Sequence, residues 1–208
     1  MIYKATHHFF LYPFFKRYAV WKIRRNFHDV YIKGEFHEKN LPVLLISNHL
    51  SWWDGFWAMY LNIRLFHRKF YFMMLEDQLK KHMFFNKTGG YSIKKGSKSI
   101  IETIDYTSSL LTDNKNMVLL FPQGEIQSLY TQPIRFEDGI GYVMKKITCD
   151  IQIIFLVTLI DFFSHPKPGL FLYFEEYQGS DFTTKTLQEE YNRFYVHCIP
   201  QNFRKKES

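Results

Sequence analysis

The sequence is poor in cysteine, in proline and in long apolar runs. Its 208 residues include two cysteines and seven prolines. Two cysteines cannot form a disulfide framework or, by themselves, a metal site, so we expect reduced thiols of the cytosol. The purest apolar runs, FFLYPFF and IIFLVTLI, are far shorter than the roughly 20 residues of a membrane-spanning helix. No small-residue cleavage site follows the first run, so we predict no signal peptide.

Internal repeats, low-complexity tracts and Pro/Gly/Ser-rich linkers are also absent from the sequence. The length suits one domain with a substantial hydrophobic core. We therefore predict an N-terminal arm over residues 1–27 and a single folded domain over residues 28–208.

Acidic residues are missing from the first 28 positions, although the whole chain has 27 basic and 20 acidic residues and a net charge of +7. Six basic residues alternate there with large aromatic ones, a mixture typical of an amphipathic helix at an anionic membrane surface. Packing of the aromatic residues into a core is the alternative. No nucleic-acid-binding module is recognisable, so we predict no nucleic-acid partner.

Beyond the arm, apolar runs typical of strands alternate with helical patterns. Several of the runs are apolar throughout, which indicates strands covered on both faces. We predict an α/β fold: one domain with a mostly parallel central sheet flanked by helices, plus the N-terminal amphipathic helical arm. The expected strands are residues 29–36, 42–47, 69–75, 91–93, 116–121, 151–160 and 169–177. The expected helices are residues 8–27, 52–62, 76–85, 100–111, 137–147 and 186–199.

The segment SNHLSWWD, residues 47–54, follows the second expected strand and contains His49 and Asp54. One interpretation is structural: Ser51 caps a helix, and Asp54 lies in its first turn. The other is a catalytic pair. A five-residue spacing brings the two side chains together only if His49 lies in the loop before the helix and Asp54 in its first turn.

Two more polar segments, GGYSIKK (residues 89–95) and FPQGE (residues 121–125), follow expected strands. Active sites of α/β folds gather at strand ends. Taken together, the three segments resemble the phospholipid and glycerolipid acyltransferase family, typified by bacterial lysophosphatidic acid acyltransferases. The resemblance covers about residues 28–175.

Each segment resembles one motif of that family. SNHLSWWD matches NHxSxxD through Asn48, His49, Ser51 and Asp54. GGYSIKK is similar to GxxFIxR through Gly89, Ser92, Ile93 and Lys95. FPQGE is similar to FPEGTRS through Phe121, Pro122, Gln123 and Gly124, and the segment 136–139 resembles the F-K-x-G that follows.

The resemblance implies an acyltransferase with His49 and Asp54 as its general-base dyad. It implies that Lys95, Gln123, Gly124 and Glu125 bind the acceptor. The residues expected to support the motifs are Asn48, Ser51, Gly89, Phe121 and Pro122. The acyl donor would be acyl-CoA or acyl carrier protein, with no cofactor and no metal. The protein would act peripherally, at the cytoplasmic face of a membrane whose lipids are its partners.

Four positions depart from the family pattern. Lys95 replaces an arginine, Gln123 replaces a glutamate, and Glu125 with Ile126 replaces Thr-Arg. Arginine binds phosphate through two parallel hydrogen bonds, whereas lysine is a point charge. We therefore expect a lysolipid or glycolipid acceptor whose head group is neutral, a diester, or rich in hydroxyl or amine groups, in preference to lysophosphatidate.

Two other functions remain open on the sequence. A catalytically silent, peripheral lipid-binding protein could keep the same fold, and the altered FPQGE segment favours that reading. The intact His49 and Asp54 pair opposes it. A metal-dependent hydrolase is less well supported, because no second histidine cluster has ligand spacing.

Overall fold

The apolar runs form a seven-stranded sheet with the order β1-β7-β6-β2-β5-β3-β4. The computed structural model describes residues 2–203. The strands are β1 (Asp29–Lys33), β2 (Val43–Ser47), β3 (Lys69–Leu75), β4 (Gly90–Ile93), β5 (Asn116–Leu120), β6 (Gln152–Asp161) and β7 (Gly169–Glu176). Strands β2 to β6 run parallel, and β7 and β1 run in the opposite direction. The prediction of a mostly parallel sheet is confirmed.

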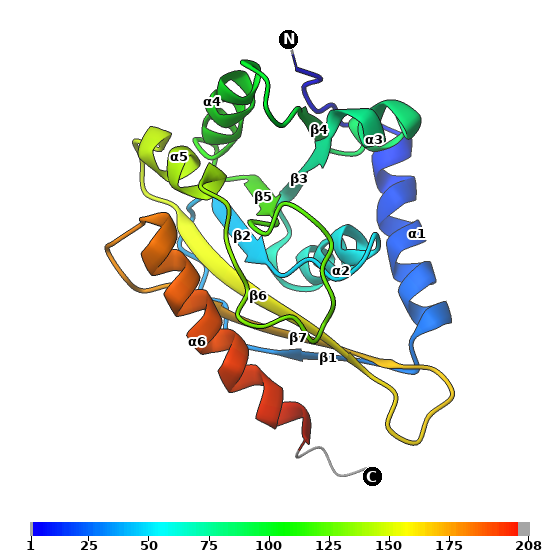
Figure 1. Cartoon of the computed structure of the whole chain (residues 1–208). Helices are drawn as coiled ribbons and strands as arrows, with labels where there is room; N and C mark the ends of the chain where they lie inside the picture. Colours follow the sequence, from blue (N-terminus) through cyan, green and yellow to red (C-terminus); the bar gives the residue numbers. More distant parts are fainter. Residues whose placement is uncertain (1, 204–208) are drawn as a thin grey trace.

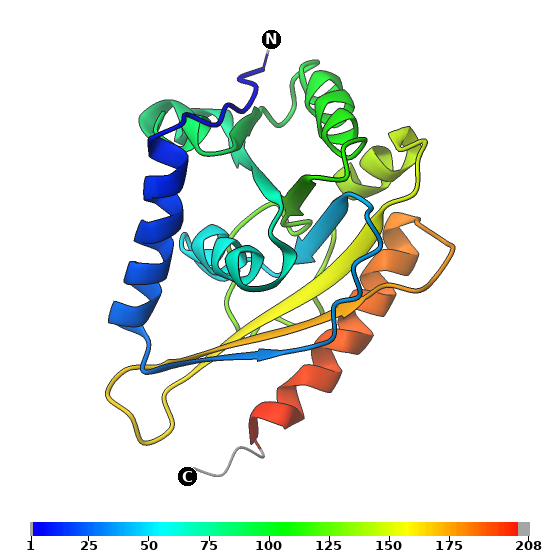
Figure 2. The same cartoon turned by 180° about the vertical axis from the view of Figure 1, so that it is seen from behind.

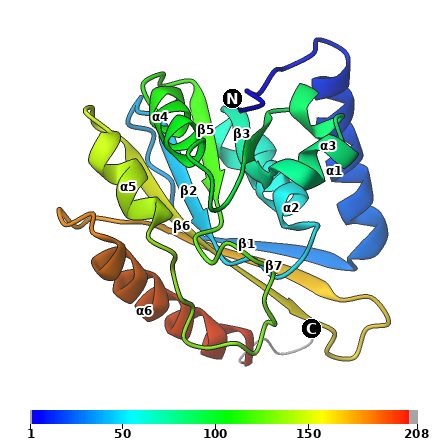
Figure 3. The same ribbon diagram turned by 45° about the horizontal axis from the view of Figure 1, so that its top comes forward.

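Helices cover both faces of this sheet (Figures 1 and 2). They are α1 (Leu11–Asn26), α2 (Asp54–Leu61) with a π-helical extension (Asn62–Phe66), α3 (Glu76–Lys81), a 3₁₀ turn (Phe85–Lys87), α4 (Ile100–Leu110), α5 (Gly139–Lys146) and α6 (Thr184–Phe203). In Figure 3, α1 and α2 lie on one side of the sheet, and α4, α5 and α6 lie on the other. The α/β architecture predicted from the alternating runs is therefore confirmed.

Strand β2 illustrates why continuous apolar runs suit this architecture. Val43 and Leu45 belong to the core on the α1–α2 side, and Leu44 and Ile46 belong to the core on the α4–α6 side. All four are fully buried, because successive side chains of a strand point to opposite faces and both faces are covered.

Helix α1 packs against α2 through Phe15, Ala19 and Ile23, which are buried and spaced four residues apart. Phe14 and Trp21 are exposed on the opposite side of the same helix. The N-terminal helix is thus amphipathic and joined to the domain core. Among the described residues, no helix combines the length and the hydropathy needed to cross a membrane.

Several predicted boundaries are wrong by a few residues. The predicted helix 52–62 begins at Asp54, and the predicted helix 76–85 ends at Lys81. The last helix spans Thr184–Phe203 and continues past Pro200, beyond the predicted end at 199. Ser99 occupies the N-cap of α4 without a capping hydrogen bond from its side chain. Local propensity sets helix ends weakly, and tertiary contacts shift them.

Candidate active site

His49 and Asp54 meet at the junction between β2 and α2. His49 lies in the loop that follows β2, and Asp54 is the first residue of α2. His49 Nδ1 lies 2.8 Å from Asp54 Oδ2, and their side chains are 22% and 2% exposed. Because the carboxylate accepts a hydrogen bond from Nδ1–H, Nε2 is the nitrogen left with a lone pair.

A single oxygen of Asp54 organises the loop. Asp54 Oδ2 also accepts hydrogen bonds from the backbone N–H groups of Leu50 (2.6 Å) and Ser51 (2.9 Å). Oδ1 is buried and has no hydrogen-bond partner among the described residues. The loop folds back so that all three donors, two backbone N–H groups and the His49 ring, converge on Oδ2.

Ser51 does not cap α2, contrary to the sequence prediction. The helix begins three residues later, and its N-cap is Trp53, which makes no capping hydrogen bond through its side chain. Ser51 Oγ instead accepts a hydrogen bond from the Trp53 N–H (3.2 Å). The serine stabilises the turn that leads into the helix.

Burial raises the pKa of Asp54, although the hydrogen bonds from His49, Ser51 and Leu50 oppose that shift. The carboxylate is therefore poorly solvated and depends on its donors. An imidazolium formed at His49 during proton transfer would be stabilised by this nearby negative charge.

Residues from neighbouring strands and from α6 contact the loop that carries His49. The His49 ring stacks on Phe121 with 4.1 Å between ring centroids and an interplanar angle of 11°. Asn48, fully buried, exchanges two hydrogen bonds with the backbone of Thr158 on β6. The Tyr191 hydroxyl accepts from the Asn48 N–H (2.7 Å) and donates to Leu156 O (2.8 Å). Asn48 and Phe121 thus position the loop and the ring.

Gln123 connects the FPQGE turn to the dyad. Its side chain is buried, and Oε1 accepts a hydrogen bond from the His49 backbone N–H (2.7 Å). Its Nε2 donates to Gln127 Oε1 (2.6 Å), and Gln127 Nε2 donates to Glu125 Oε1 (3.1 Å). The backbone N–H of Gln127 also donates to His49 O (2.9 Å). Gln123 and Glu125 therefore belong to one hydrogen-bonded chain that begins at His49.

Lys95 forms an ion pair with Glu137. Its Nζ lies 2.6 Å from Glu137 Oε1 and donates to Gly124 O (3.0 Å). Gly124 has φ +69°, and a Cβ there would lie 2.5 Å from Glu137 Oε1, so glycine leaves room for the ion pair. The Gly124 N–H donates to Phe121 O, and Pro122 O accepts from the Glu137 N–H. Gly124 therefore has no free N–H to offer an oxyanion.

Gly89 lies away from the dyad, near the start of β4. It has φ +108°, and a Cβ at this position would lie 2.1 Å from Phe70 O and 3.0 Å from His7 Nε2. The glycine permits close contact with the backbone of β3 at Phe70 and with the His7 side chain of the segment that precedes α1. Its role in the fold is thus to let its own backbone lie close to that of Phe70.

An apolar cavity of about 490 Å³ opens beside the dyad. His49, Phe121, Pro122, Gly124, Lys95 and Glu125 are among its lining residues. On one side of the sheet the lining includes Phe15, Phe56, Phe72 and Phe85, and on the other it includes Ile104, Leu120, Ile140 and Val143. The cavity thus reaches both hydrophobic cores at the carboxyl ends of the parallel strands.

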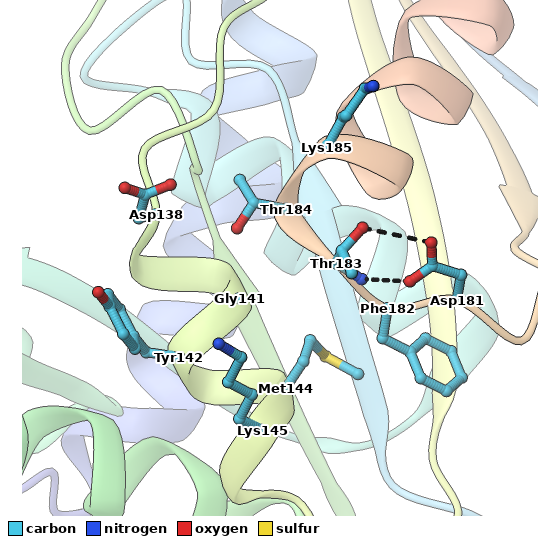
Figure 4. A pocket seen from close by; sticks show the side chains of 10 residues that line it. All are labelled: Asp138, Gly141, Tyr142, Met144, Lys145, Asp181, Phe182, Thr183, Thr184 and Lys185. Atoms are coloured by element: carbon cyan, nitrogen blue, oxygen red, sulfur yellow. Dashed lines mark hydrogen bonds between the residues drawn. The ribbon is translucent and has the colours of Figure 1, made fainter.

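A second groove, of about 560 Å³, lies between α5 and the start of α6 (Figure 4). Asp181 in this groove accepts hydrogen bonds from the N–H and hydroxyl groups of Thr183, so its carboxylate is engaged in the turn before α6. None of the predicted site residues lines this groove. Among residues 2–203, no group of three or more His, Cys, Asp or Glu side chains is arranged to hold a metal ion.

Sequence reasoning missed Gln127, Glu137 and Tyr191 as parts of the site. Glu137 lies in the segment FEDG, which resembles a family motif, but the motif predicted no function for this residue. Gln127 and Tyr191 lie in segments with no motif, and Tyr191 reaches Asn48 from 143 residues away. Only packing reveals such contacts.

Comparison with known proteins agrees with this geometry. A family model described as acyltransferase matches residues 29–157, which is more than half of the chain and includes all three motif segments. No curated protein sequence matches the chain.

Proposed function

Because the chain belongs to the acyltransferase family, we propose that it transfers a fatty acyl group from an acyl thioester to a hydroxyl or amine of a lysolipid or glycolipid acceptor. The observation that carries this proposal is the His49–Asp54 pair, 2.8 Å apart, at the wall of an apolar cavity. The thioester would come from acyl-CoA or acyl carrier protein.

The proposed reaction needs one base. As the acceptor O–H attacks the thioester carbonyl, its proton moves to His49 Nε2, and a new C–O bond forms. Asp54 keeps the ring in the correct tautomer and stabilises the imidazolium. When the C–S bond breaks, the imidazolium returns the proton to the leaving thiolate. The direct attack requires no serine or cysteine nucleophile.

The apolar lining of the cavity supports a role for two apolar chains in the reaction. Its lining extends into the cores on both faces of the sheet, and His49 lies among the lining residues. We assign one part to the acyl chain being transferred and the other to the chain of the lipid acceptor. Burial of each methylene would contribute about 0.8 kcal/mol to binding.

We further propose that the protein works at the cytoplasmic face of a membrane as a peripheral protein. Phe9, Phe10 and Phe14 are 73%, 69% and 59% exposed, and Trp21 is 49% exposed. Phe9 and Phe10 precede α1, and Arg17, Arg24 and Arg25 are exposed on the helix itself with Phe14 and Trp21. Exposed aromatic groups next to basic ones suit insertion among the head groups of anionic lipids.

The test uses purified protein, labelled acyl-CoA or acyl carrier protein, and a panel of lysolipids, with products identified by mass spectrometry. Wild-type protein should form diacyl product. His49→Ala should lose nearly all turnover while its unfolding curve and its vesicle binding stay near wild type, because the imidazole is needed only for chemistry. His37→Ala, at an exposed position outside the cavity, is the matched control.

Two results would contradict the proposal. If His49→Ala kept more than a few per cent of wild-type turnover, the base would lie elsewhere. If the wild-type protein bound acyl chains and vesicles without turning over any donor, the protein would be a lipid-binding protein that has kept the fold.

A further inference from the structure

The charged groups in the cavity do not suit an anionic acceptor. The Lys, Arg, Asp and Glu residues of its lining are Lys95, Glu125 and Glu137. Lys95 is paired with Glu137 at 2.6 Å, so its charge is already compensated. Lys94, Lys98 and Arg135, which could have replaced a missing phosphate-binding arginine, are not among the lining residues. The carboxylate of Glu125 is therefore the charge left without an opposite partner in the lining.

The hydrogen-bonded chain fixes where this carboxylate lies. The backbone N–H of His49 can only donate, so Gln123 must present Oε1 to it and Nε2 to Gln127. Gln127 then presents Nε2 to Glu125, which can only accept when ionised. All three hydrogen bonds run in one direction, from His49 to Glu125. Bonds aligned in this way strengthen one another and hold the last acceptor in place.

We propose that Glu125 selects an acceptor lipid that carries a positively charged amine, by pairing its carboxylate with that ammonium group beside the dyad. Among residues 2–203, no salt bridge involves Glu125. Glu125 is exposed, so its carboxylate lies at the solvent-facing rim of the cavity. A substrate ammonium would supply the missing cation there, whereas a terminal phosphate would meet a like charge. This inference rests on the proposed acyl transfer and adds the class of its acceptor.

The experiment compares acceptors that differ only in the ammonium group. Lysophosphatidylethanolamine and its N-acetyl derivative share the acyl chain, the glycerol and the phosphodiester, but only the first carries a positive charge. With one acyl-CoA donor, the wild-type protein should use the free amine at least tenfold better by kcat/KM, and should use lysophosphatidate less well than the amine.

Two variants test the role of Glu125. Glu125→Gln keeps an acceptor oxygen for Gln127 and removes the charge, so the preference for the free amine should fall about tenfold. Glu125→Lys should shift the preference towards lysophosphatidate. Glu189→Gln, an exposed change on α6 outside the cavity, should leave the wild-type preference unchanged.

An equal preference for the two acceptors in the wild type, or the same preference in Glu125→Gln as in the wild type, would overturn the inference. Either result would leave acyl transfer itself intact, because product would still form. Failure of the proposed function would look different: no acceptor in the panel would be acylated.

Discussion

At the scale of the residue, Asp54 combines burial with an uneven set of hydrogen bonds. Oδ2 accepts three, whereas Oδ1 has no partner among the described residues. Its pKa is raised by desolvation, so the ionised form is disfavoured in the folded protein relative to the unfolded chain. A raised carboxyl pKa means that the folded state binds more protons than the unfolded state above the ordinary carboxyl pKa of about 3.9.

Asp54→Asn should therefore separate activity from stability. Turnover should fall by about two orders of magnitude or more, because the amide cannot stabilise the imidazolium. The wild-type free energy of unfolding, minus that of Asp54→Asn, should decrease as pH rises from about 4 through the raised pKa. Denaturant titrations of both proteins across that pH range measure this difference in the free energy of unfolding. A difference that stays constant with pH would contradict the assigned cause.

Gln123 and Glu125 should be energetically coupled through Gln127. A glutamate at 123 would draw the Gln127 amide N–H₂ towards itself and turn Oε1 towards the Glu125 carboxylate, so two acceptors would face each other. Gln123→Glu should destabilise the protein by about 1 kcal/mol, and adding Glu125→Thr should recover most of that loss. A double-mutant cycle measures the coupling, and strictly additive effects would refute it.

At the scale of the element, the segment before α1 is fastened to the edge of the sheet. His7 Nε2 lies 2.9 Å from Phe70 O, its ring packs edge-on against Tyr12 and Tyr71, and its backbone forms a bridge with Thr88. Burial lowers the pKa of His7 from 6.5 to about 4, so the imidazole is neutral at pH 7. The neutral ring can then lie between the two tyrosines at the start of the N-terminal helix.

This contact should make stability depend on pH with a definite sign. Between pH 6.5 and about 4, the unfolded chain binds a proton that folded His7 does not, so the free energy of unfolding should fall as pH falls through that window. His7→Gln should show a shallower fall than the wild type in denaturant titrations. The neighbouring, exposed His8→Gln is the control and should keep the wild-type slope. Equal slopes for wild type and His7→Gln would exclude His7 as the source.

At the scale of the whole molecule, α1 has one buried face and one exposed face. Phe15, Ala19 and Ile23 fill the core, whereas Phe14, Arg17 and Trp21 follow one another at helical spacing on the opposite side. Deleting the arm would therefore remove core residues together with the exposed ones. Point changes on the exposed side test membrane contact without opening the core.

Replacing Phe14 and Trp21 together by Ala should weaken binding to anionic vesicles at least tenfold and leave the unfolding curve nearly unchanged. Binding by the wild type should also weaken with added salt, since each surface Lys or Arg contributes about 1 kcal/mol through a screened field. Vesicle co-sedimentation measures both effects. Tyr130→Ala, at an 89% exposed loop position, is the control. Unchanged binding in the double variant would place the membrane contact on another surface.

The sequence alone determined the fold class, because continuous apolar runs such as residues 42–47 and 116–121 encode strands buried on both faces. It also singled out His49 and Asp54, through the resemblance of three ordered segments to family motifs, and the five-residue spacing predicted that His49 lies in the loop and Asp54 in the first helical turn. These features depend on local periodicity and on short spacings, which can be read directly from a chain.

The tertiary structure alone decided what surrounds the dyad. Lys95 pairs with Glu137 across 42 residues, and Tyr191 reaches Asn48 across 143. Folding brings together the groups that form the series of hydrogen bonds from His49 to Glu125. The direction of these bonds then follows from which groups can only donate and which can only accept. Such partners are chosen by three-dimensional packing and by the cost of leaving a buried polar group unpaired, and neither is visible in sequence spacing.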